Sequence, residues 1–179
     1  MSQPAAHLAA IRVLTPERLC QEYAAAICRF AALLSPTPDE AADLAQETLL
    51  RAVRKLDQFD PRRGSMEAWL WRIAANTARD LKRRATRRTA LWRRLTTWWQ
   101  EPTTSVEARA LDAVTSRELV AAVHSLPARD RLLIGLRFGA DLDLAAVGAA
   151  VGIGEAAAGR AVLRALLKLR AQLEAHRDE

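Results

Sequence analysis

The chain has 179 residues and a formal net charge of +6, and half of its residues are hydrophobic. This length allows one domain or two small ones with real cores. Gly and Pro number only 7 each, so the composition favours helices, and no window reads as a run of strands. No apolar stretch is long enough for a bilayer span and no signal peptide is present at the N-terminus, so we expect a cytoplasmic protein without membrane insertion.

The positive charge is concentrated in the centre of the chain. Residues 1–50 carry a net charge of −3 and residues 101–179 carry −1, whereas residues 51–100 carry +10. Within the central part, residues 57–88 combine a glycine-broken loop, Trp69, Trp71 and a dense basic run. Aromatic rings beside cations are suited to unstacked bases and their phosphates. Two alternatives stay open, a solvated basic helix end and a membrane-surface helix.

Two helices are predicted before this central stretch. The first covers residues 15–34, where apolar residues recur at helical steps, and it ends at Ser35-Pro36. The second starts with Thr37 as the cap, Pro38 at the first helical position and Glu40 completing a capping box, and it runs to about residue 57. Cys20 and Cys28 lie too far apart on one helix for a disulfide, so we expect two packed thiols.

The second helix has two distinct sides. Its expected core side consists of Ala42, Ala45, Leu49, Ala52, Val53 and Leu56. The opposite side carries Asp43, Glu47, Leu50 and Arg54, with Glu47 and Arg51 spaced for an ion pair. This outward side is either a solvated face or a docking patch for another helix, and Leu50 among charges is the reason to consider docking.

A third helix is predicted to start after Gly64 with Ser65 as its cap. Its core side is Met66, Leu70, Ile73, Ala74, Thr77 and Leu81. A polar stripe of Arg72, Asn76, Arg79 and Arg83 follows another side, bordered by Trp69. Three guanidinium groups and one amide offer phosphate contacts and one group for a base edge. Trp71 projects elsewhere and is expected to pack against the first helix.

The helical pattern stops near Ala85 and resumes near Val114, which indicates a linker with a short helix at about Leu91 to Trp99. Four helices are predicted beyond it, at residues 115–124, 128–138, 142–151 and 155–175, and Asp141 or Asp143 caps the third of them. Gly148 provides the small residue for a close helix crossing, and apolar residues surround the glycine turn that follows. This pattern is typical of a helix-turn-helix.

No catalytic constellation stands out. His7, His124 and His176 are scattered, no Gly-rich phosphate loop exists, and no carboxylate pair is separate from ordinary helix surface. We therefore expect neither an enzyme nor a cofactor or metal site.

The order of the motifs resembles a known family. The segments DEAADLAQETLLRAV, KLDQFDPRRGS, AWLWRIAANTARDLKRR, LPARDRLLIGLRF and AAVGAAVGIGEAAAGRAVLRALLKLR are similar to the extracytoplasmic-function (ECF) group of the sigma-70 family of bacterial RNA polymerase sigma factors. The resemblance implies an all-α fold of two small helical domains joined by a linker. These are a three-helix sigma region 2 at 12–88, a linker at 89–113 and a four-helix sigma region 4 with a helix-turn-helix at 114–175.

The resemblance also implies a sigma factor that binds core RNA polymerase and directs promoter recognition and opening. Contacts to the beta-prime clamp helices would come from Asp43, Leu44, Gln46, Glu47 and Leu50. Binding and melting of minus-10 DNA would fall on Phe59, Asp60, Arg62, Arg63, Gly64, Ser65, Trp69, Arg72, Asn76, Arg79, Lys82 and Arg83. Further implied partners are the beta flap of the polymerase, promoter DNA and an anti-sigma factor, and the free protein would be a monomer.

The second half departs from the family pattern. The expected minus-35 recognition helix begins with Gly, Glu and a run of Ala, which offer no groove-reading donors, and Gly159 weakens it by roughly 1 kcal/mol relative to Ala. Only Arg160, Arg164 and Lys168 remain for DNA backbone contact. The alternative is a sigma-like regulator that docks on polymerase or a partner without independent minus-35 recognition. We also expect the free protein to fold its two domains against each other.

Overall fold

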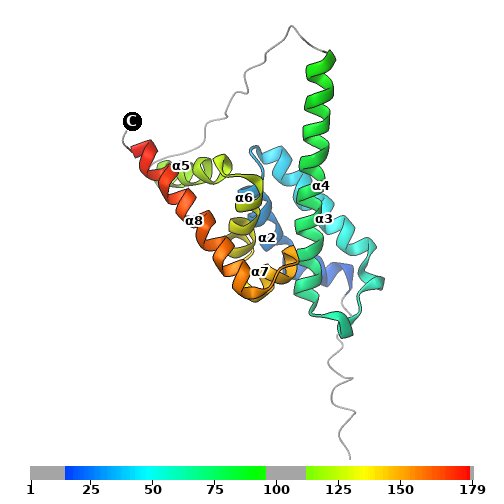
Figure 1. Cartoon of the computed structure of the whole chain (residues 1–179). Coiled ribbons are helices and arrows are strands. Elements are labelled where there is room, and N and C mark those ends of the chain that lie inside the picture. Colours follow the sequence, from blue (N-terminus) through cyan, green and yellow to red (C-terminus); the bar gives the residue numbers. More distant parts are fainter. Residues whose placement is uncertain (1–14, 96–111, 178–179) are drawn as a thin grey trace, which may run out of the picture.

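A computed structural model of the chain describes residues 15–95 and 112–177. Helices form both described ranges, and neither contains a strand (Figure 1). The first range, which we term the first domain, holds α2 (Pro16–Leu34), α3 (Pro38–Arg54), the 3-10 turns η1 (Leu56–Gln58) and η2 (Pro61–Arg63), and α4 (Met66–Leu95). The second domain holds α5 (Asp112–Ser125), α6 (Ala128–Ile134), the π-helical turn η3 (Gly135–Gly139), α7 (Leu144–Val151) and α8 (Glu155–Arg177).

Side-chain caps fix four helix starts. The side chain of Thr37 accepts from the backbone N–H of Glu40 at 3.2 Å, as the capping pattern predicts. The remaining capping side chains are Thr15, Ser65 and Asp143. The predicted starts at Ser65 and at one of the two aspartates are therefore confirmed, and the aspartate is Asp143.

The core of the first domain lies where α2, α3 and α4 meet. Trp71 is 1 % exposed and packs edge-on against Phe30, with 5.5 Å between the ring centroids. The predicted packing of Trp71 against the first helix is thus confirmed. Its indole N–H has no hydrogen-bond partner among the described residues, so shape and apolar area rather than polar contacts hold this ring.

The third predicted helix proves longer than its apolar pattern. α4 continues to Leu95, whereas Leu81 is the last of its described side chains that packs against the core. The basic run contains no Gly or Pro and is rich in good helix formers, which favours a helical backbone even where the apolar pattern has ended. Of the short helix expected at Leu91 to Trp99, the part up to Leu95 belongs to α4. Trp98 and Trp99 lie outside the described residues.

Two other expectations about burial are confirmed only in part, since the expected core residues Ala45 and Ala52 of α3 are buried but others are not. On α3 the buried residues are Leu44, Ala45, Thr48 and Ala52, while Ala42 is exposed. The core side is rotated toward Leu44 because α2 and α4 both pack on this helix, which a single apolar stripe does not anticipate. Cys28 is exposed on α2, and only Cys20 is a partly packed thiol.

The second domain contains the expected helix-turn-helix, formed by α7, a short turn and α8. Gly152 ends α7 with φ 80°, a left-handed conformation that favours glycine. A Cβ on Gly148 would lie 2.6 Å from the backbone oxygen of Ile153, so the turn folds directly over this glycine. In the described ranges no single helix is long and apolar enough to cross a membrane; only α7 and α8 taken together, bent by 96°, reach the required length and composition.

The two domains pack against each other. α6 and η3 lie on α2, and α7 lies along α4 (Figure 1). One continuous cluster of buried side chains includes Phe30 and Trp71 from the first domain and Leu132, Leu136 and Val147 from the second. The expected closed arrangement is therefore confirmed in this structure.

Candidate nucleic-acid interface

The loop that leads into α4 is built from short turns. Asp60 caps η2 by accepting from the backbone N–H of Arg62 at 3.0 Å. Gly64 then adopts φ 143°, which L side chains rarely adopt, and the chain reverses into the cap of α4. Arg62, Arg63 and Ser65 are exposed along this loop. The loop residues expected to bind DNA thus lie together at the N-terminal end of α4.

An aromatic corner joins the loop to the helix. Phe59 and Trp69 are both half-buried and meet edge-on, with 5.6 Å between their ring centroids. The sequence assigned one ring to the loop and the other to the helix, and the fold brings them into contact. Half-exposed rings held in a fixed orientation are a suitable surface for an unstacked base.

The polar stripe continues from this corner along α4. Arg72, Asn76 and Arg83 are exposed, and Arg79 is partly exposed. Arg79 donates to the side-chain oxygen of Asn76 at 3.0 Å. Because that oxygen is occupied, the amide N–H groups of Asn76 remain to donate to a ligand. The stripe therefore offers positive charge and hydrogen-bond donors.

A salt-bridge brace fixes α3 against α4. The guanidinium of Arg51 contacts Asp80 at 2.9 Å and Glu47 at 2.6 Å. The hydrogen bond to Asp80, followed by that to Glu47, raises the pKa of Arg51 further above its ordinary value. The spacing of Glu47 and Arg51 predicted one half of this brace, but Asp80 was missed. The sequence feature that could have indicated this role is an acidic residue among the many basic residues of the C-terminal part of α4.

The outward side of α3 shows most of the residues expected to contact polymerase. Asp43 and Gln46 are exposed, and Leu50 is 40 % exposed. Glu47 is partly shielded within the brace. Leu44 departs from the expectation, because it is only 4 % exposed and belongs to the core.

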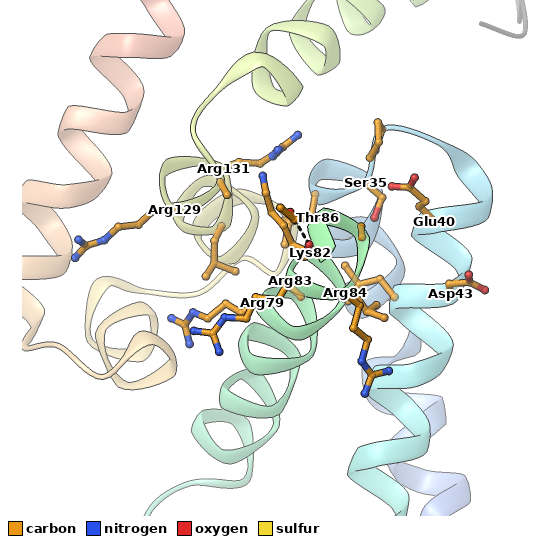
Figure 2. Close-up of a pocket in the computed structure, with 18 of the residues that line it drawn as sticks. Ser35, Glu40, Asp43, Arg79, Lys82, Arg83, Arg84, Thr86, Arg129 and Arg131 are labelled. Atoms are coloured by element: carbon orange, nitrogen blue, oxygen red, sulfur yellow. Dashed lines mark hydrogen bonds between the residues drawn. The ribbon is translucent and has the colours of Figure 1, made fainter. Parts of the chain in front are cut away.

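A cleft of about 1430 Å³ separates the C-terminal half of the stripe from the second domain (Figure 2). Its apolar floor includes Leu81, Leu132, Leu133 and Ile153. Six cations line it, namely Arg79, Lys82, Arg83 and Arg84 from α4 and Arg129 and Arg131 from α6. Arg129 and Arg131 were not predicted to join this group, because they lie on α6, far from α4 in the sequence.

Arg131 repels Lys82 in the cleft, whereas Glu40 attracts Arg131. Burial lowers the pKa of Lys82, and the nearby positive charge of Arg131 lowers it further. Glu40 and Asp43 are the acidic residues among those that line the cleft. None of the six cations forms an ion pair with a residue of the described ranges. The closed domains thus enclose more positive charge than they neutralise.

α8 shows a different surface from α4. Arg160 and Arg164 are exposed, but Lys168 is bound to Asp130 of α6 at 2.6 Å. Two leucines, Leu163 and Leu167, are 58 % and 59 % exposed between these cations. The ladder expected to grip DNA backbone is therefore reduced to two free arginines around an apolar strip.

Comparison with known protein families agrees with this two-domain organisation. Residues 19–88 match the family model for sigma-70 region 2, and residues 122–171 match that for sigma-70 region 4. The chain therefore belongs to the sigma-70 family, whose members act in transcription rather than as catalysts.

The matched relatives are sigma factors of the ECF group. One is the ECF RNA polymerase sigma factor SigE of Mycolicibacterium smegmatis, 37 % identical over 68 residues, which make up 38 % of this chain and 26 % of the relative. Another is EcfG of Rhodopseudomonas palustris, 47 % identical over 51 residues, which make up 28 % of each chain. The matched segments thus span about a quarter of the length of these relatives.

Two solved structures share the fold. CnrH, in complex with the cytosolic domain of CnrY, superposes with a TM-score of 0.62 at 24 % identity and covers 96 % of this chain and 95 % of its own. The sigma factor RpoE of Bartonella quintana, in complex with the anti-sigma factor NepR, gives 0.68 at 24 % identity, with 88 % and 96 % coverage.

Proposed function

We propose that this protein is a sigma factor that binds core RNA polymerase and opens promoter DNA at the minus-10 element through its first domain. The observation that carries the proposal is the continuous surface from the Phe59–Trp69 corner to Arg83. It combines half-exposed rings, an amide donor and guanidinium groups on one helix. A flipped base needs a ring to stack on and hydrogen bonds to its edge. Neutralisation of the phosphate charges by cations offsets the free-energy cost of unstacking the base.

Polymerase binding is assigned to the outward side of α3. Asp43, Gln46 and Leu50 are accessible there, and the Glu47–Arg51–Asp80 brace fixes this face relative to the stripe on α4. Leu44 is left out of the contact surface because it is buried. Docking of α3 on a polymerase helix would therefore position the stripe against the melted strand.

The second domain is proposed to serve mainly as a tether. Base reading in the major groove requires hydrogen-bond donors and acceptors, whereas α8 opens with Glu155 followed by alanines. Arg160 and Arg164 are exposed on α8 and would contact the DNA backbone. Promoter choice would then depend chiefly on the minus-10 element.

An anti-sigma factor is the proposed inhibitory partner. The protein is proposed to be cytoplasmic and to be a monomer when it is free. CnrH and RpoE share the fold and were solved in complexes, the second of them with an anti-sigma factor. The cationic cleft between the domains is chemically suited to an acidic partner segment.

Run-off transcription with core polymerase tests the proposal. Promoters with and without a minus-35 element are compared, and we expect transcripts from both, with little dependence on the upstream element. An Arg160→Ala/Arg164→Ala chain should lower the yield equally on both templates. Absence of any transcript despite polymerase binding would sink the sigma-factor assignment. Strong dependence on the minus-35 element would instead restore base reading by α8.

A further inference from the structure

One carboxylate lies within the basic part of α4. From Arg72 to Arg94 every charged residue is Arg or Lys except Asp80. Its spacing of four residues from Asn76 and three from Arg83 places it on the surface of α4 beside the polar stripe. The side chain of Asp80 is 45 % exposed. A carboxylate without a partner at this position would repel the phosphates of a nucleic acid.

The sequence favours a partner for Asp80 on its own helix. Arg83 and Arg84 follow it by three and four residues, and an acid placed before a base at this spacing forms the better helical pair. Within the described ranges Asp80 pairs with neither of them, and its carboxylate accepts instead from Nη1 of Arg51 on α3 at 2.9 Å. Arg83 extends beside Arg79 on one side of α4 (Figure 2). These guanidinium groups therefore keep their charge for a ligand.

The position of Arg51 allows it to hold this carboxylate. Its Nε donates to Glu47, one turn earlier on α3, at 2.6 Å, while its Nη1 reaches across to α4. The side chain of Arg51 is only 20 % exposed. A guanidinium donates in fixed directions, so the hydrogen bond to Glu47 orients the group that meets Asp80. The Asp80 carboxylate is thereby held toward α3.

The main effect of this contact is on the neighbouring charges. Ion pairs that are partly open to solvent add little to the stability of a fold. We propose that Arg51 is a positioning residue for nucleic-acid binding, because it holds the carboxylate of Asp80 toward α3 and so leaves Arg83 and Arg84 free for the phosphates of single-stranded DNA. The choice of DNA as the ligand rests on the proposed function, whereas the competition between the ion pairs does not.

Binding of the full chain to a labelled oligothymidine, followed by fluorescence anisotropy, tests this role. Arg51→Gln should weaken binding roughly fivefold at about 0.05 M salt, because Asp80 then pairs with Arg83 or Arg84 and removes one phosphate contact. Lys55→Gln removes the same charge from an exposed side chain at the end of α3 and should bind as wild type does. Equal affinities for wild type and a folded Arg51→Gln chain would refute the role, as would the absence of binding by wild type.

A second substitution separates this role from a purely structural one. Asp80→Asn should bind as wild type does, and Arg51→Gln/Asp80→Asn should return to within about twofold of wild type, since no carboxylate is left to capture the arginines. A contact that only holds α3 against α4 would give no such recovery. Arg51→Gln/Glu47→Gln should stay weak, because Glu47 lies on α3. Equal recovery in both double variants would show that net charge matters and the position of Asp80 does not.

The salt dependence of binding gives an independent readout. Between about 0.05 and 0.5 M salt, Arg51→Gln should show a slope reduced by about 0.7, the value for one phosphate contact on a single strand. Arg51→Gln/Asp80→Asn should regain the slope of wild type. Weaker binding with an unchanged slope would contradict the proposal. Arg51→Lys keeps the charge without the fork and should lose less, and it provides the same test if Arg51→Gln does not fold.

Run-off transcription with core polymerase separates this inference from the proposed function. If the oligothymidine affinities change as expected but wild type gives no transcript, the role of Arg51 stands and the sigma-factor assignment fails. If wild type gives transcripts while Arg51→Gln binds oligothymidine as tightly as wild type, only the role of Arg51 fails.

Discussion

α4 and α8 are both long helices with cations on an exposed side, yet their surfaces differ in kind. α4 places arginines and an amide beside the Phe59–Trp69 corner. α8 places Arg160 and Arg164 beside the exposed Leu163 and Leu167, without an aromatic ring or an amide among them. A similar content of cations therefore does not make the two helix surfaces alike. What distinguishes α4 is the combination of charge with aromatic rings and a free amide donor.

The two domains nevertheless share a core, and Trp71→Ala would test how far they depend on each other. Removing this buried ring leaves a cavity against Phe30, which the second domain also contacts. We expect a loss of about 3–5 kcal/mol in the free energy of unfolding, in one cooperative transition measured by thermal denaturation. Trp71→Phe should cost less, because the ring is kept and the unpaired indole N–H is removed. Two separate transitions would show that the domains are energetically independent.

The aromatic corner is the next test of the difference between α4 and α8. Trp69→Ala should weaken binding to a single-stranded minus-10 oligonucleotide by about 1–3 kcal/mol, because a stacking surface is lost. The matched control is Phe138→Ala, which removes a ring that is 53 % exposed on the second domain. Fluorescence anisotropy should show no change for this control. Equal losses for both variants would mean that exposed aromatic area, not the corner, determines binding.

A smaller effect on DNA binding is expected for a single arginine of the polar stripe, and the salt dependence of binding measures it. Arg72→Ala should weaken binding to the same oligonucleotide several-fold and reduce the salt slope by about 0.7, the value for one phosphate contact on a single strand. Arg160→Ala should leave both quantities unchanged, because α8 lies in the other domain. If only Arg160→Ala reduced the salt slope, the single-strand binding site would have to be assigned to α8.

The smallest effect is expected at the ion pair that ties α8 to α6. Lys168 is 53 % exposed and Asp130 14 %, so their 2.6 Å contact is partly screened by solvent. Lys168→Ala should lower the free energy of unfolding by less than about 1 kcal/mol in urea titrations. Its DNA affinity should stay close to that of wild type, since the ammonium group already has a partner. A large loss of DNA affinity would show that Lys168 leaves Asp130 to grip the backbone.

Much of the secondary structure could be predicted from residues that are close together in the sequence. Caps and turn glycines act through neighbouring residues, so Thr37, Ser65 and either Asp141 or Asp143 were predicted as helix starts, and the structure shows that Asp143 is the cap. The polar stripe followed from helical periodicity in the same way. The end of α4 was misplaced because the basic run lacks the regular apolar spacing from which helices are predicted.

Most helices, the helix-turn-helix and the position of the cationic surface could be predicted from the sequence, because they depend on residues a few positions apart. The packing of the helices was needed to show that Leu44 faces the core, that Asp80 completes the brace on Arg51, and that Arg131 lies near Lys82. The close approach of Gly139 to Phe30 belongs to the same group. Each of these pairings joins segments distant in sequence, and their contact is set by how the helices pack together rather than by any local pattern.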